Sequence, residues 1–220
     1  KSPENLKLLN EQKAIITAYR QSLNKMREAY RNGNAARDVM GAKADIANAQ
    51  INALETSVQQ SSDSPERFTQ FLAVTQAKNE FLQARYEVRG YTNSPNAETE
   101  ARAATQLEKA VAGLKGLSVA FGTGQQSALS ALETALVAYR SAVQSYKAAN
   151  ADIVTARAEM TTQGADIVTI SDKLYDIQLE RRDAESTQAR SLQLISTLLA
   201  LLVGVIAAWV ITRQITRPIQ

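Results

Sequence analysis

Two arginines, Arg85 and Arg89, stand one helical turn apart in the stretch "FLQARYEVRGY", which otherwise has the spacing of an amphipathic helix. Its apolar residues Phe81, Leu82 and Val88 predict the stripe that faces a core, and both arginines fall on or beside that stripe. A buried guanidinium without a partner is costly, so a counter-anion is expected. The planar fork of arginine suits a carboxylate, and this spacing therefore predicts a carboxylate-binding clamp. The alternative is that the arginines reach solvent or pair with nearby glutamates: Glu80, Glu87 or Glu98.

Tyr139 is a third candidate for the same site. If the chain folds back at loops near residues 63, 94–95 and 122, then Arg85 lies beside Gly41 and level with Tyr139. Tyr139 holds a core position in a heptad series, so its hydroxyl needs a buried partner. A small carboxylate between Arg85 and Tyr139 would satisfy both groups, although Tyr139 could equally serve only in packing. The next residue, Arg140, is expected at the rim of the bundle and is the weaker candidate for ligand contact.

Arg157 and Thr161 form a second candidate pair, one helical turn apart. Arg157 continues the series of Leu129, Leu136 and Val143, so the pattern predicts that it faces inward. The two residues could present a charge and a hydroxyl to a second acid. The alternative is a salt bridge from Arg157 to one of three acids: Asp38, Asp45 or Asp152.

Other chemistries are poorly supported by the composition. The 220 residues contain no cysteine and no histidine, which removes thiolate and imidazole nucleophiles and nearly all zinc chemistry. No glycine-rich phosphate loop and no convergent carboxylate pair is present, so we expect no enzyme, no catalytic residue, no metal and no cofactor. The net charge of +3 is small and dispersed, which argues against nucleic acid as a partner.

Four helices are expected to position the candidate residues, because Ala, Leu, Gln, Glu, Lys and Arg dominate a chain with only 9 glycines and 4 prolines. The sequence "SSDSPE" predicts a helix that opens at Pro65 with Ser64 as its cap. Breaks at this loop, at "TNSPN" and at "SVAFGTGQQ" divide the chain into helices 3–60, 65–91, 97–117 and one that begins at 127.

An uncharged segment, Leu194 to Ile211, is long enough to cross a membrane, and the predicted span is 192–212. Trp209 suits an interfacial position near its end. Arg213 and Arg217 follow directly, so the positive-inside rule places the C-terminus in the cytoplasm and residues 1–190 outside.

A repeat relates the first and last long helices. Residues 18–40, "AYRQSLNKMREAYRNGNAARDVM", match residues 138–160 without a gap, so that Arg37 pairs with Arg157. Together with the helix lengths, this predicts an all-α fold of two stacked antiparallel bundles on two long helices, followed by a transmembrane helix. The membrane-distal bundle is expected at about 34–157. The proximal part, about 1–33 and 158–190, has only two helices, and we expect further helices and a first membrane span upstream.

The paired helices, the repeated "AYR…AR…M" and the stretch "ARYEVRGYTNSPNAE" resemble the helical bimodular sensor domain of methyl-accepting chemotaxis receptors and some sensor histidine kinases. The sequence "ITRQITRPIQ" resembles the start of a HAMP linker at 213–220, with Pro218 at its characteristic proline. The resemblance implies a chemoreceptor of the bacterial inner membrane, with residues 1–190 in the periplasm. It also implies small organic acid ligands such as malate, succinate and acetate, a homodimer, and cytoplasmic signalling partners. A histidine kinase sensor and a ligand-free membrane-anchored coiled-coil adaptor are the alternatives.

Overall fold

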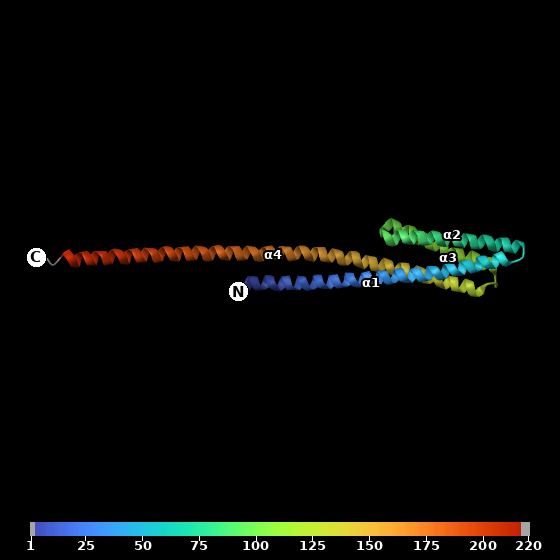
Figure 1. Cartoon of the computed structure of the whole chain (residues 1–220), viewed down its shortest axis with the longest axis horizontal. Helices are drawn as coiled ribbons and strands as arrows, with labels where there is room; N and C mark the ends of the chain where they lie inside the picture. The colour runs from blue at the N-terminus through green and yellow to red at the C-terminus, as the bar shows by residue number, and fades with distance from the viewer. Residues whose placement is uncertain (1–2, 217–220) are drawn as a thin grey trace. The chain divides into compact units, whose positions relative to one another are not determined.

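The computed structural model describes the backbone of residues 3–216 and the side chains of residues 3–206 and Trp209. Every secondary-structure element in this part of the chain is an α-helix, which confirms the predicted all-α class (Figure 1). The helices are α1 (Pro3–Gln60), α2 (Pro65–Asn93), α3 (Ala97–Phe121) and α4 (Gln126–Thr216).

The connection between α1 and α2 forms as its sequence predicts. Ser64 has extended backbone angles, and its side chain accepts a hydrogen bond from the backbone N–H of Arg67 at 3.1 Å. Pro65 occupies the first turn, where its missing N–H costs nothing.

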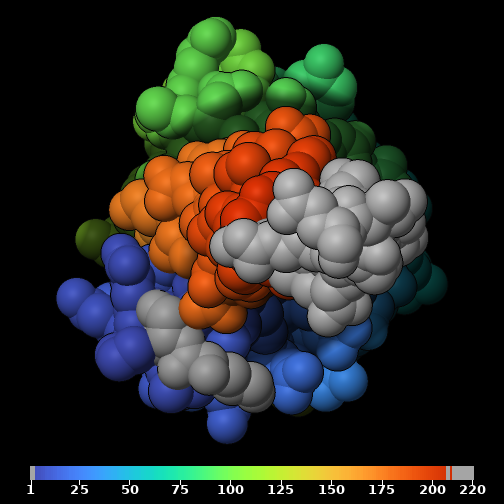
Figure 2. All heavy atoms as spheres, turned by 90° about the vertical axis from the view of Figure 1, so that its left-hand side faces the viewer, coloured from blue at the N-terminus to red at the C-terminus, as the bar shows by residue number. Residues whose placement is uncertain are grey.

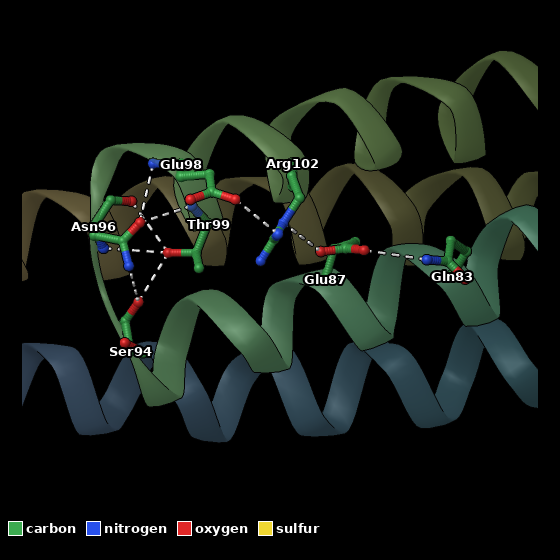
Figure 3. A network of polar contacts seen from close by, with 7 residues as sticks. All are labelled: Gln83, Glu87, Ser94, Asn96, Glu98, Thr99 and Arg102. Carbon is green, nitrogen blue, oxygen red and sulfur yellow. Dashed lines mark hydrogen bonds and ion pairs between the residues drawn. The ribbon is translucent and has the colours of Figure 1, made fainter.

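The α2–α3 connection is closed by a capping box, drawn in Figure 3. The Asn96 side chain accepts from the backbone N–H groups of Glu98 and Thr99, and the Thr99 hydroxyl accepts from the backbone N–H of Asn96. Arg102 pairs with Glu98 at 3.0 Å and with Glu87 of α2 at 3.3 Å, which joins the first turns of α3 to α2 (Figure 3).

Two glycines that could have weakened the long helices do not interrupt them. Gly33 lies in continuous helix and is buried against Tyr146 and Ala149 of α4. Gly164 is likewise within unbroken α4. Helix α3 ends four residues later than predicted, at Phe121, and the glycine at position 122 with φ 55° ends it.

The chain divides into two compact units, described here separately: residues 20–161, and residues 1–19 with 162–220. All four helices contribute to the core of the first, which we call the four-helix unit, and α2 and α3 lie side by side there (Figure 1). Its most completely buried large side chains are Ile51, Leu54, Phe81, Leu117 and Leu132.

The buried face of α2 differs by one residue from the predicted stripe. Its buried series is Val74, Ala77, Phe81, Ala84, Val88 and Tyr91. Phe81 and Val88 are therefore confirmed as core residues, but Leu82 is 46% exposed and that part of the prediction is wrong. Arg89, which shares the heptad position of Leu82, is exposed for the same reason.

The second unit, the two-helix unit, contains the start of α1, coloured blue in Figure 2, and the later part of α4, coloured orange to red. Gln12 donates a hydrogen bond to the Ser171 hydroxyl at 2.9 Å, and Ile170 is buried. Helix α4 contains a stretch, up to Ile206 among the described residues, that is long and apolar enough to cross a membrane by length and composition. Of the predicted HAMP segment, residues 217–220 and the side chains of 213–216 lie outside the described part.

Candidate ligand-binding site

A cavity of about 290 Å³ opens where α1, α2 and α4 meet in the four-helix unit, and we call it the arginine cavity. It is lined by Arg37, Met40, Gly41 and Ala44 of α1, by Arg85, Val88, Arg89, Thr92 and Asn93 of α2, and by Tyr139 of α4. Three of these residues carry a guanidinium group and none carries a carboxylate. The predicted convergence of Arg85, Gly41 and Tyr139 at one level is thus what the structure shows.

Tyr139 is buried at the inner end of this cavity, at 4% exposure. Its ring meets Phe81 edge-on, with 6.2 Å between ring centroids, which fixes its orientation. Its hydroxyl makes no hydrogen bond to any described residue, although the oxygen is not sealed from solvent. Burial raises the pKa of Tyr139 to about 12, although Arg85 and Arg89 act in the opposite direction. The phenol therefore stays protonated at neutral pH and can donate a hydrogen bond.

Arg85 lies at the side of the cavity with its side chain 31% exposed. Its position one residue beyond the buried Ala84 explains this partial burial. The nearest carboxylate is that of Asp45 on α1, at 3.9 Å and with the acid 80% exposed. An ion pair this long and this open to water contributes little, so most of the hydrogen-bonding capacity of Arg85 remains for a ligand. The alternative pairing with glutamates is not formed, and Glu87 pairs with Arg102 instead.

Arg37 is the one arginine of the lining that the sequence did not suggest as a ligand contact. Its guanidinium donates to the backbone carbonyl of Thr92 at the end of α2 and to the Tyr146 hydroxyl at 3.1 Å. The Tyr146 hydroxyl donates to the same carbonyl at 3.0 Å, and the Arg37 cation lies 5.0 Å from the centre of the Tyr146 ring. A cation at a helix C-terminus is favourable, so Arg37 ties α1 to the end of α2.

The internal repeat is the sequence signal that points to Arg37. Arg37 aligns with Arg157, so the argument that makes Arg157 a candidate ligand contact applies equally to Arg37.

Arg89 and Arg140 take different positions from each other. Arg89 lines the arginine cavity as an exposed side chain without an ion pair in the described part of the chain. Arg140 points to a different cavity between α3 and α4, where it pairs with Glu108 at 3.3 Å. Its predicted place at a rim is correct, but it is not brought together with Arg85.

Arg157 and Thr161 are both exposed, so the prediction that Arg157 faces inward is wrong for the chain as described. The buried residue at this level of α4 is its neighbour Ala156. The Thr161 hydroxyl donates to the backbone carbonyl of Arg157 at 3.0 Å, which is a local helix contact. None of the predicted acids forms a salt bridge with Arg157 among the described residues.

The arginine cavity is suited to binding a small anion. Its guanidinium groups provide planar, paired donors at the mouth, and the Tyr139 hydroxyl provides a donor at the inner end. Asp45 at the edge does not cancel this positive charge. The arrangement offers hydrogen bonding and charge, with no nucleophile or proton-transfer group arranged for catalysis among the lining residues.

The fold and this cavity together define an all-α helical bundle with an arginine-lined cavity, continued by a candidate membrane span. More specifically, the chain belongs to the helical bimodular sensor domain family, which matches residues 1–189. It is 50% identical over 221 residues to the methyl-accepting chemotaxis protein McpS of Pseudomonas putida (strain KT2440), an alignment that covers 100% of this chain. It is 32% identical over 218 residues to McpQ of the same organism, covering 99% of this chain. The chain spans 34% of the length of each of these relatives.

Proposed function

We propose that this chain is the sensor and membrane-spanning part of a methyl-accepting chemotaxis receptor, and that it recognises small organic acids rather than catalysing a reaction. The observation that carries the proposal is the arginine cavity, which brings three guanidinium groups and a buried phenol together without a carboxylate in its lining. Family membership and the likeness to McpS support the receptor role.

The size and charge of the cavity favour a small carboxylate as its ligand. A volume of about 290 Å³ holds about ten water molecules, which is room for acetate or a C4-dicarboxylate such as malate or succinate with several waters. The carboxylate would accept from Arg85 and from the Tyr139 hydroxyl, with Arg37 or Arg89 available for a second carboxylate group.

Signalling would follow from the position of this ligand among three helices. An acid that contacts α1, α2 and α4 would bind more tightly to one arrangement of these helices than to another. Its binding would therefore increase the population of the first arrangement. The α4 displacement would then pass through the predicted span at 192–212 to a HAMP linker at 213–220 and on to cytoplasmic signalling partners.

The proposed location is the bacterial inner membrane, with residues 1–190 in the periplasm and the receptor a homodimer. Arg213 and Arg217 support this orientation, since positive residues remain on the cytoplasmic side. Arg157 and Thr161 remain candidates for contact with a second acid, as exposed side chains one helical turn apart on α4.

Titration calorimetry of the purified chain with acetate, malate and succinate tests the arginine cavity. We expect at least one acid to bind, and Arg85→Ala to weaken its binding roughly tenfold or more, because a hydrogen-bonded charge pair is lost. Arg102→Ala is the matched control, since Arg102 forms ion pairs with glutamates and does not line the cavity.

Two results would contradict the proposal. One is the absence of heat with every acid from a chain whose helical circular dichroism is intact. The other is equal loss of affinity in Arg85→Ala and Arg102→Ala, which would mean that the effect is one of overall charge.

A further inference from the structure

A second cavity lies between α3 and α4 in the four-helix unit, and the α3–α4 cavity, as we call it, differs in chemistry from the arginine cavity. Its volume is about 170 Å³. Its apolar wall consists of Ala103, Ala104 and Leu107 of α3 and Val143 of α4. The end of α2 contributes Tyr91, and no residue lines both cavities.

The charged residues around the α3–α4 cavity neutralise one another. Glu100 pairs with Lys147 at 2.6 Å, and Glu108 pairs with Arg140 at 3.3 Å. Each pair joins α3 to α4, and together they contribute two positive and two negative charges. The cavity therefore has no excess charge with which to attract an ion.

Tyr91 contributes a hydroxyl group to the lining of this cavity. The residue is 2% exposed, and its hydroxyl makes no hydrogen bond to any described residue, although the oxygen is not sealed from solvent. Its ring is held edge-on against Tyr146, with 5.6 Å between ring centroids. Burial, with further contributions from Glu100 and Tyr146, raises the pKa of Tyr91 to about 12, so the hydroxyl keeps its proton. Because no described residue engages this hydroxyl, a bound molecule with an oxygen acceptor can take the place of water as its hydrogen-bond partner.

We propose that the α3–α4 cavity is a second ligand site, which takes a neutral molecule of the size of a six-membered ring with one oxygen acceptor, oriented by the Tyr91 hydroxyl. The size follows from comparison with an engineered apolar cavity of about 150 Å³ in another protein, which binds benzene. The neutrality follows from the balanced ion pairs. The oxygen acceptor follows from the buried Tyr91, since Gln144, the other uncharged polar residue of the lining, is exposed. This ligand differs in class from the acids proposed for the arginine cavity.

Fluorine NMR with 4-fluorophenol tests the site, using the chain in lipid nanodiscs and empty nanodiscs to measure partitioning into lipid. We expect saturable line broadening with the chain. Ala104→Leu should abolish the saturable part, because Ala104 lines the cavity while being exposed, so a larger side chain there fills space without disturbing the core. Tyr91→Phe should weaken binding about three- to tenfold through loss of one hydrogen bond.

Arg85→Ala tests whether the two cavities bind their ligands independently. It should leave the binding of 4-fluorophenol unchanged while weakening the binding of an organic acid, so that the two proposals can be contradicted separately. The proposal is overturned if Ala104→Leu broadens the signal as the original chain does, if Tyr91→Phe binds equally well, or if Arg85→Ala removes 4-fluorophenol binding.

Discussion

The Tyr139 hydroxyl and the Arg85 guanidinium face one cavity without forming a hydrogen bond to each other, and each has capacity left for a ligand. This pairing was predictable, because folding the helices back about their loops places the two residues at one level whatever their exact rotation. Arg37 was not predicted, since its contacts are to a backbone carbonyl and a hydroxyl, and residue types alone do not reveal such partners.

Removal of the Tyr139 hydroxyl should weaken binding and leave stability nearly unchanged. In Tyr139→Phe the unfolding free energy without ligand should change by less than about 1 kcal/mol, because no hydrogen bond to a described residue is lost. Acid affinity should fall about three- to tenfold. Thermal unfolding and calorimetry measure the two effects.

Tyr146→Phe is the control for this experiment, since the Tyr146 hydroxyl donates to the Thr92 carbonyl and its loss should destabilise the chain by about 1 kcal/mol. If Tyr139→Phe were destabilised to the same degree, its hydroxyl would have a structural partner and the proposed ligand contact would be wrong.

Asp45→Asn should increase acid affinity. The exposed Asp45 carboxylate is 3.9 Å from Arg85 and competes weakly with a ligand carboxylate, so its removal should strengthen binding about two- to fivefold. Asp38→Asn on the same helix removes one charge outside the cavity and should have a smaller effect. Equal gains in both variants would attribute the change to net charge alone.

Among the elements, the positions of the helices were more predictable than their rotation. Pro65 and the Asn96 cap mark helix starts by local chemistry, and these signals do not depend on the rest of the fold. The buried face of α2 depends on which neighbours approach it. Two heptad series one residue apart contain apolar residues, and Leu82 belongs to the one that the other helices leave exposed.

A methyl group at Gly33 should stabilise α1. A Cβ there would meet Ala149 and Tyr146 at 3.8 Å, which is ordinary contact, and alanine is favoured over glycine within a helix by about 1 kcal/mol. The midpoint of thermal unfolding of Gly33→Ala should therefore rise. Gly41→Ala is the comparison, with a similar gain in helix propensity but a position in the arginine cavity. A lower midpoint in Gly33→Ala would mean that the α1–α4 contact cannot accept the methyl group.

Glu159 makes the contact between α1 and α4 sensitive to low pH. The Ser22 hydroxyl donates to its carboxylate at 2.7 Å and Lys25 pairs with it at 3.3 Å, and these contacts lower the pKa of Glu159 from its usual 4.5. Because the folded-state pKa is the lower one, this stabilisation is complete above about pH 4.5 and is lost as the pH falls through the folded-state value.

Glu159→Gln should therefore lose stability near pH 6 and show a smaller further loss between pH 5 and 3 than the original chain. Urea unfolding at a series of pH values measures this. Glu28→Gln, at an exposed position of α1, is the control and should follow the original chain. An acid-induced loss of unchanged size in Glu159→Gln would show that other carboxylates cause it.

For the whole molecule, composition and repeat were sufficient to predict the all-α class, and the family confirms it. The exposure of Arg157 was not predictable from its heptad position, because a seven-residue series indicates a helix face but not whether other helices cover that face. The domain boundaries near 34 and 157 remain predictions.

Acid binding should be visible in the stability of the complete chain. A ligand that binds only the folded state, at 100 times its dissociation constant, adds about 2.7 kcal/mol to the unfolding free energy. Differential scanning fluorimetry with the acid should show this increase, and Arg85→Ala should reduce it at the same acid concentration. An equal shift in Arg85→Ala would place the acid elsewhere in the molecule.

The use of arginine and tyrosine in the arginine cavity determines how ligand binding should depend on the pH of the medium. Guanidinium groups keep their charge at any pH that bacteria tolerate, the Tyr139 phenol keeps its proton up to a pKa of about 12, and the chain has no histidine. Between about pH 6 and 9, a receptor built this way would report how much organic acid is outside without confusing it with how acidic the medium is.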